Sequence, residues 1–240
     1  MSRAFRLTAL ASAALLAAVS AAAQMTPAPS PATTPGMTTP GMMSATTPAP
    51  TAARRPMSPP GTAATQVGGR WTKDAEGEMR YSDGKWIEVT YARPILRGRE
   101  NIFGQGADYG KTVAGDSPVW RAGANATTRL KTEAPLEIGG KRIAPGEYSV
   151  FVDLKQPAWT LILSRQPHQM KYDPNDKAAT WGAYNYDPKQ DVVRAPMKMM
   201  KPAVSVDQFT IAFVDMTDTG GKLAMAWGRD AGVVEFKVVP

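Results

Sequence analysis

The sequence contains no cysteine among its 240 residues. Disulfide bonds and thiolate metal ligands are therefore excluded, and so is a lipid anchor attached to an N-terminal cysteine. Because exported domains commonly rely on disulfides, any exported domain in this chain must be stabilised by core packing alone.

Histidine is nearly absent as well, since His168 is the only one in the chain. A transition-metal site built from several histidines is excluded. Nucleophilic catalysis has little support without cysteine or a G-x-S-x-G elbow, and the turn-like Gln-Pro-His-Gln context of His168 favours a solvated loop residue over a catalytic base. We therefore expect no catalytic residue, no metal and no cofactor.

Long apolar runs are also lacking, except near the N-terminus. Arg3 and Arg6 precede an apolar run over residues 7–19, and small residues follow at 20–23. This order is typical of a secretory signal peptide, here residues 1–23, cleaved after Ala23. The run is shorter than the about 20 apolar residues of a membrane-spanning helix. We expect an exported protein, periplasmic or extracellular, without a transmembrane anchor.

Residues 24–66 contain no acidic and no aromatic side chain, whereas proline, threonine, alanine and methionine dominate. Such a segment cannot bury enough apolar surface to offset its ordering entropy. We predict a disordered, partly polyproline linker. Its methionine thioethers are soft ligands that suit Cu(I), but their irregular spacing favours a plain spacer.

A strong excess of positive charge is absent from the remainder of the chain. The formal net charge is +7, but four of the arginines lie in the signal peptide and the linker. Residues 67–240 carry 24 basic and 21 acidic side chains, a net charge of +3. No basic stripe is concentrated along them, so we expect no nucleic-acid partner.

Short alternating runs separated by turn residues fill the segment 67–240, which we predict to be one domain. This alternating pattern is typical of an antiparallel all-β domain, and the segment is long enough to form one sizeable core. About ten strands are expected. That number favours a β-sandwich or a jelly-roll-like fold over a single open sheet.

Two dipeptides predict hairpins within this domain. Asp-Gly at 83–84 separates the alternating runs 79–82 and 85–91, and Gly-Gly at 139–140 separates another pair of short runs. Both dipeptides adopt the positive backbone angles that two-residue hairpin turns require.

Two segments, 95–125 and 165–190, are long and lack a periodic pattern. Long irregular loops in a folded domain are usually functional or disordered. We therefore expect a ligand site built from these two loops. Its candidate ligand-binding residues are Arg97, Arg121, Asn125, Trp181, Tyr184 and Asp187.

The arginines of the first loop suggest one kind of ligand. The planar guanidinium groups of Arg97 and Arg121 suit a small anionic group such as a carboxylate, phosphate or sulfate. The alternative is structural, because the same groups can pair with acidic neighbours and pin the loop.

The aromatic residues of the second loop suggest another kind of ligand. Trp181 and Tyr184 can stack on the apolar faces of a glycan while nearby Asn125 and Asp187 bind its hydroxyls. The alternative is that these large rings plug the open end of a sandwich.

Carboxylates are frequent in the second loop, at Asp173, Asp176, Asp187 and Asp191. The spacing at 173–176 fails the pattern of a calcium loop, and aspartate before proline commonly begins a turn. Our leading hypothesis is a non-catalytic ligand- or partner-binding module of the cell envelope. The alternative is a carboxylate-dependent envelope hydrolase.

Several strings in this domain are also distinctive. Val-Thr-Tyr-Ala-Arg-Pro stands at 89–94, Val-Trp-Arg-Ala-Gly-Ala-Asn at 119–125, Pro-Gly-Glu-Tyr-Ser at 145–149 and Trp-Gly-Ala-Tyr-Asn-Tyr-Asp at 181–187. They resemble a bacterial family of secreted proteins catalogued as domain of unknown function 2911. The resemblance implies an extracytoplasmic β domain without an established activity, and an apparent insertion at 112–118 departs from its pattern.

Overall fold

The computed structural model describes residues 57–240, so the predicted signal peptide and residues 24–56 of the predicted linker lie outside the described residues. Within residues 57–240 the chain forms fourteen strands, all paired antiparallel in named sheets, and the predicted all-β sandwich is confirmed. The count exceeds the about ten strands expected for two reasons. β1 (Pro60–Val67), β2 (Arg70–Lys73) and β5 (Thr128–Thr132) had not been anticipated, and one strand expected over 192–200 forms two, β10 (Asp191–Pro196) and β11 (Lys198–Met200).

The first sheet has six strands in the order β1-β4-β5-β8-β9-β10. On β4, Ile87 and Val89 are buried while Trp86 and Glu88 point outward, as the alternation of a half-buried strand requires. The strands are β1 (Pro60–Val67), β4 (Lys85–Ala92), β5 (Thr128–Thr132), β8 (Gly146–Asp153), β9 (Thr160–Ser164) and β10 (Asp191–Pro196).

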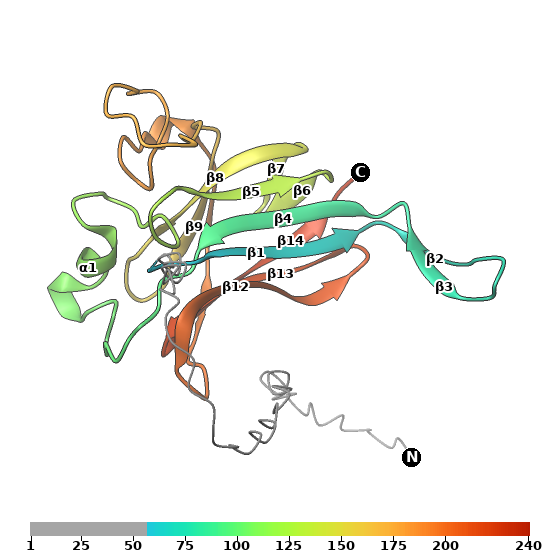
Figure 1. Ribbon diagram of the computed structural model, residues 1–240, viewed down its shortest axis with the longest axis horizontal. Coiled ribbons are helices and arrows are strands. Elements are labelled where there is room, and N and C mark those ends of the chain that lie inside the picture. The colour runs from blue at the N-terminus through green and yellow to red at the C-terminus, as the bar shows by residue number, and fades with distance from the viewer. Residues whose placement is uncertain (1–56) are drawn as a thin grey trace, which may run out of the picture. The chain divides into compact units, whose positions relative to one another are not determined.

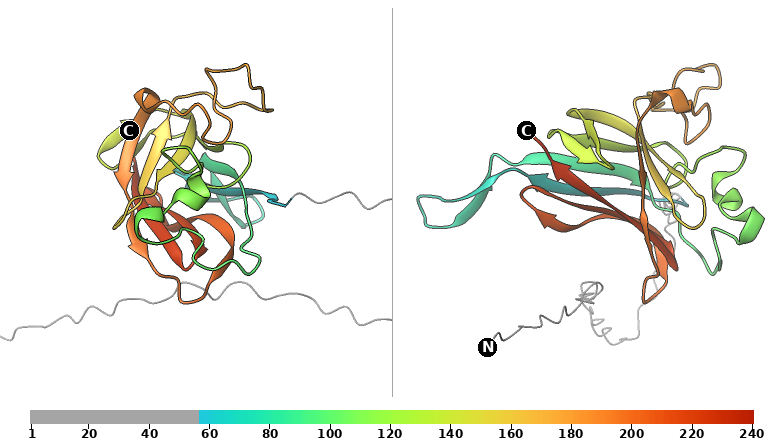
Figure 2. Two further views of the ribbon diagram at one scale, coloured as in Figure 1. Left: turned by 90° about the vertical axis from the view of Figure 1, so that its left-hand side faces the viewer. Right: turned by 180° about the vertical axis from the view of Figure 1, so that it is seen from behind.

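The second sheet has the order β12-β13-β14-β6-β7, with β11 also paired to β14. It lies against the first sheet in Figure 1 and Figure 2. Its strands are β6 (Leu136–Ile138), β7 (Lys141–Ile143), β11 (Lys198–Met200), β12 (Val206–Thr217), β13 (Gly220–Gly228) and β14 (Asp230–Val238). The chain crosses from the first sheet to the second at Met197, which is buried between β10 and β11.

An aromatic cluster fills the core between the sheets. Phe103 contacts four other rings, with a centroid distance of 4.8 Å to Trp159 and 5.5 Å to Trp120. Trp120 stacks on Trp227 at 6.2 Å with an interplanar angle of 11°. Phe103 and Trp120 both come from the first long loop, so this loop is anchored inside the core.

Between residues 57 and 240 helical structure is limited to single turns: η1 (Gly106–Asp108), α1 (Lys111–Ala114) and η2 (Pro188–Gln190). α1 lies within the segment that contains the apparent insertion. No helix among residues 57–240 has the length and apolarity to cross a bilayer.

The hairpin predicted around residues 83–84 is wrong. β3 (Met79–Ser82) pairs with β2 (Arg70–Lys73), while β4 pairs with β1. The Asp-Gly dipeptide is instead a bend within one long hairpin, and the glycines at 68–69 interrupt the partner strand opposite it. Gly-Gly at 139–140 does form the predicted hairpin, because both glycines have positive φ and β6 pairs with β7.

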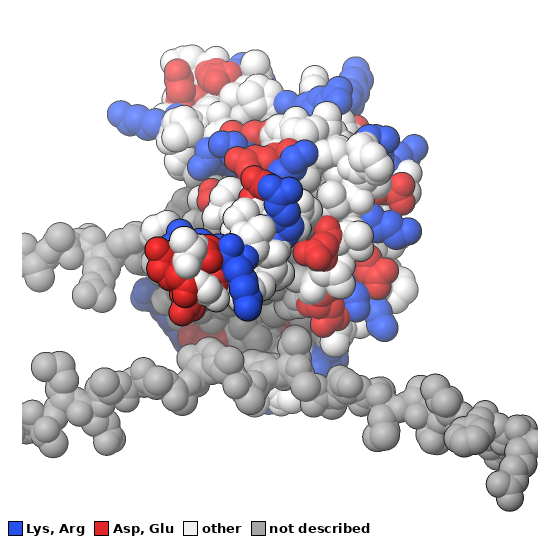
Figure 3. Space-filling view, turned by 90° about the vertical axis from the view of Figure 1, so that its right-hand side faces the viewer, with Lys and Arg blue, Asp and Glu red and all other residues white. Residues whose placement is uncertain are grey.

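The end of this long hairpin, residues 68–84, is called the arm. It extends beyond the sandwich in Figure 1. It carries two ion pairs, with Arg70 2.8 Å from Asp83 and Arg80 2.8 Å from Asp74. Basic and acidic side chains are interspersed on the face of the molecule seen in Figure 3.

The linker predicted for 24–66 extends too far toward the C-terminus. β1 occupies residues 60–67 and pairs with β4 from Pro60 opposite Ala92 to Val67 opposite Lys85. Alanine, threonine and glycine supply too little apolar contrast for an alternating pattern, so composition alone concealed the strand. Its hydrogen bonds to β4 and the buried Val67 side chain hold it in the sheet.

We expect limited proteolysis of the chain to leave a resistant fragment that begins before Pro60, because a strand paired along its full length is protected from cleavage. Mass spectrometry of the fragment gives its first residue. A stable fragment that begins at residue 67 or later would contradict the pairing of β1.

Candidate functional site

The second long loop, residues 165–190, packs on the outer face of the first sheet. Phe151 and Ile162 point outward from β8 and β9, yet both are fully buried in a small cluster with Val119 and Ala183. The Tyr186 ring packs edge-on against Phe151 with centroids 5.0 Å apart. The loop therefore has an apolar attachment of its own, separate from the core between the sheets.

Two buried glutamines hold the backbone of this loop. The Gln166 amide donates to the Asn185 carbonyl at 2.6 Å and accepts from the Asp187 N–H at 2.8 Å. The Gln169 amide both donates to the Asp173 carbonyl at 3.1 Å and accepts from its N–H at 2.8 Å. These side chains replace the backbone partners that a strand would have, so the irregular loop is ordered without a ladder.

The two long loops meet, as the predicted site requires. The Ser117 hydroxyl donates to the Ala183 carbonyl at 3.2 Å, and the buried Thr127 hydroxyl donates to the Gly182 carbonyl at 2.9 Å. Arg121 packs so closely on Gly182 that a Cβ atom there would lie 2.7 Å from its Nη1. Arg121 and Asn125 of the first loop thus lie beside the turn that carries Trp181; this contact is called the loop junction.

Arg121 is the central charge of the loop junction. Its Nη1 donates to the Asn125 carbonyl at 3.1 Å, and it forms no ion pair with any acidic side chain in residues 57–240. Burial lowers the pKa of Arg121. The other guanidinium nitrogens of Arg121 form no hydrogen bond with the described residues, and they are not fully buried. These donors are therefore accessible to solvent.

Trp181 and Tyr184 lie at the two ends of a tight turn, in which the Tyr184 N–H donates to the Trp181 carbonyl at 3.0 Å. Trp181 is partly exposed, belongs to neither buried cluster, and has the Tyr172 ring 6.1 Å away. Tyr184 is 50% exposed, with the Lys177 ammonium 5.6 Å from its ring. Both rings are surface features rather than plugs of the sandwich.

The structure does not bring Arg97 and Asp187 into this group. The Asp187 carboxylate caps η2 by accepting the Lys189 N–H at 3.0 Å. Arg97 is exposed and lies in a segment attached to β12, where the Leu96 N–H donates to the Asp207 carbonyl at 2.8 Å. That segment and the second loop are well separated in both Figure 1 and Figure 2.

Two other arginines, Arg93 just before the first loop and Arg99 within it, are structural. Arg93 donates to the Phe209 carbonyl at 3.3 Å, and Arg99 donates to the Leu96 carbonyl at 2.9 Å while its guanidinium lies 5.8 Å from the Trp227 ring. They hold the loop by donating to backbone carbonyls and, in the case of Arg99, by contact with an aromatic face. Neither forms an ion pair with an acidic side chain among residues 57–240.

The loop aspartates are occupied by turns and by one ionic network. Asp173 accepts the Asn175 N–H at 2.8 Å, and Asp176 accepts the Ala178 N–H at 2.9 Å. Asp191 accepts the Tyr186 hydroxyl at 2.6 Å and is 2.8 Å from Arg194, which also pairs with Asp153 at 3.0 Å. Burial, with the Asp191 hydrogen bond next in importance, raises the pKa of Tyr186.

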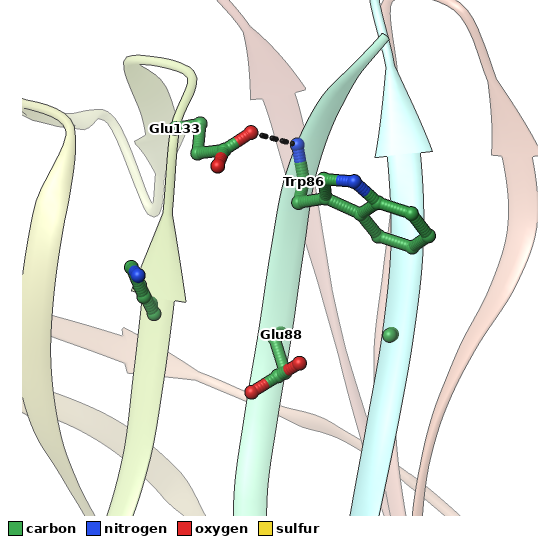
Figure 4. Close-up of a pocket in the computed structure, with 5 residues that line it drawn as sticks. Trp86, Glu88 and Glu133 are labelled. Atoms are coloured by element: carbon green, nitrogen blue, oxygen red, sulfur yellow. Dashed lines mark hydrogen bonds between the residues drawn. The ribbon is translucent and has the colours of Figure 1, made fainter.

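A second feature, which the sequence analysis missed, is a depression on the outer face of the first sheet. It has a volume of about 410 Å³ and is lined by Ala64, Trp86, Glu88, Lys131 and Glu133 (Figure 4). Trp86 is 49% exposed at an outward position of β4. The available signal in the sequence was Trp86 alone, a large ring on the polar side of an alternating strand.

His168 lies near this face in a cluster with Arg129 and Glu147. Its Nε2 is 3.2 Å from Arg129 Nη1, which itself is 3.1 Å from the Glu147 carboxylate. Burial, with a smaller contribution from Arg129, lowers the pKa of His168. His168 is thus partly buried and paired, rather than the solvated loop residue expected.

The fold and the two surface features define a β-sandwich with elaborated loops. The chain belongs to the family described as protein of unknown function (DUF2911), whose model matches residues 74–237. The resemblance seen in the sequence is thereby confirmed. No curated protein and no solved structure matches the chain significantly.

Replacing Gly182 by alanine should destabilise the domain more than replacing Gly98. Both glycines have positive φ, where a side chain costs about 1–2 kcal/mol. Only at Gly182 would the new Cβ also collide with Arg121 and with the Asn125 carbonyl, which adds about 1–3 kcal/mol. Urea denaturation of both variants measures the difference. Equal losses would mean that the loop junction is not tightly packed.

Stability should fall as the pH drops below about 6.5, the unfolded value for histidine. The pKa of His168 is lower in the folded state, so the unfolded chain binds more protons in this window and acid favours unfolding. Urea denaturation at pH 7.5 and pH 5.5 should show a larger loss for the native chain than for His168→Gln. Because His168 is the only histidine, equal losses would contradict the shift.

Proposed function

We propose that this domain is a non-catalytic binding module of the bacterial cell envelope, exported by its signal peptide, and that the loop junction binds a small anionic ligand. The observation that supports this most strongly is Arg121, a partly buried guanidinium without an acidic partner among residues 57–240. A desolvated positive charge gains from an anion, because the low local dielectric strengthens their attraction.

The surroundings of Arg121 suit a ligand with an acidic group and a larger body. The Arg121 fork can bind a carboxylate, phosphate or sulfate through two parallel hydrogen bonds. Asn125 has an exposed side chain that makes no hydrogen bond with the described residues. Trp181 and Tyr184 add ring surfaces for an apolar portion or a sugar ring.

The alternative, a carboxylate-dependent hydrolase, is less well supported. Such an enzyme needs two carboxyl groups that face one cleft. Asp153 and Asp191 are both held by Arg194. Glu88 and Glu133 share the depression in Figure 4, but both are exposed on an open sheet face, where water is not excluded from a reaction.

Phosphate, sulfate and citrate should raise the melting temperature of the native chain above that in sodium chloride of equal ionic strength. Arg121→Ala should abolish this rise, because the guanidinium is the proposed anion ligand. Without anion it should cost only about 1 kcal/mol, the value of one hydrogen bond. Differential scanning calorimetry gives both quantities.

Arg97→Ala is the matched control, since it removes the same charge from an exposed residue away from the loop junction. It should keep the full anion response. If both variants lose the anion-dependent rise in melting temperature equally, the rise depends on net charge and not on Arg121. A large drop in melting temperature of Arg121→Ala without anion would make Arg121 a structural residue.

A further inference from the structure

We propose a second, independent site: the outer face of β1, β4 and β5 binds a neutral saccharide chain, with the Trp86 indole as its stacking platform. This site shares no residue with the loop junction and does not rest on an anionic ligand. Its lining comes from three adjacent strands of the first sheet, so its geometry is fixed by the backbone ladder.

The Trp86 ring is left open by its neighbours. Gln66 lies opposite Trp86 on β1, and the next outward residue of β1 is the small Ala64. Figure 4 shows the indole extended across β1. A ring that is 49% exposed on a rigid strand provides a flat apolar surface at low entropic cost, which suits the carbon-bound hydrogens of a sugar ring.

Polar groups surround this ring at fixed positions. The Glu133 carboxylate accepts the Trp86 backbone N–H at 2.8 Å, while the Glu133 backbone N–H donates to the Trp86 carbonyl at 2.9 Å. The first bond fixes the carboxylate beside the β4 backbone at Trp86. Glu88 lies opposite Lys131 in the ladder, and neither forms an ion pair within residues 57–240. The site therefore presents both acceptors and a donor for hydroxyl groups.

The charge balance selects a neutral polyhydroxylated ligand. Two carboxylates and one ammonium repel a polyanion such as nucleic acid, because the net charge of the lining is negative. A single tryptophan among charged groups offers too little contiguous apolar surface for a membrane or a hydrophobic peptide. The depression of about 410 Å³ is open to solvent, which leaves room for a saccharide chain to continue along the sheet.

The test is isothermal titration calorimetry of the full exported chain with three neutral hexasaccharides, of β-1,4-linked glucose, of β-1,4-linked N-acetylglucosamine and of α-1,6-linked mannose. We expect at least one to bind. Trp86→Ala should weaken that binding about tenfold or more, since the platform is lost. Its fold should survive because the side chain is half exposed, and circular dichroism and melting temperature check this.

Trp71→Ala is the matched control, because Trp71 is 63% exposed on the same long hairpin but does not line the depression. It should keep the native affinity, and so should Arg121→Ala. No binding of any of the three saccharides overturns the proposal, and so does an equal loss in the Trp86 and Trp71 variants. Loss of saccharide binding only in Arg121→Ala would also overturn it, by moving the ligand to the loop junction.

Discussion

The aromatic cluster between the two sheets is the interaction on which the rest of this domain depends. Without a disulfide to close its ends, the sandwich is held by rings that fill the space between its layers. Phe103 and Trp120 each contact four other rings, and both belong to a loop rather than a strand. Core packing therefore also fixes the path of the first long loop, and removal of a buried ring of this size costs about 3–5 kcal/mol.

This anchoring explains how two irregular segments can present a defined surface. The first loop is held from inside by its aromatic residues, and Trp120 pairs with Val152 through two backbone hydrogen bonds of 2.8 Å. The second loop is held by Gln166 and Gln169 and by the small cluster around Phe151. Arg121 stands where the two meet. Its guanidinium is oriented by the Gly182 backbone and the Asn125 carbonyl before any ligand arrives, and such preorganisation lowers the entropic cost of binding.

The outer face of the first sheet is divided into two parts with different chemistry. Toward β9 and β10 it is covered by the second loop, so that outward residues such as Ile162 are buried. Toward β1 and β4 it is open, and there the large outward ring is Trp86. The covered half of the sheet holds the second loop in place through apolar contacts, whereas the open half exposes the apolar Trp86 ring to water. The contrast within one sheet is what makes the exposed half a binding face in our proposal.

The sequence by itself determined the fold class, the family and the hairpin at residues 139–140, because alternation and turn chemistry are local properties. It failed at β1, whose alanines and threonines carry little hydrophobic contrast, and at residues 83–84, where a hairpin signal became a bend because β1 and β2 supplied the pairing partners. Among the candidate residues, Arg121, Asn125, Trp181 and Tyr184 lie about the loop junction, while Arg97 and Asp187 lie elsewhere. Only the tertiary structure could decide this, because which charges find partners and which rings stay exposed depends on contacts between segments far apart in the chain. The same holds for Trp86, whose outward face stays open only because its neighbours across the sheet are small or polar.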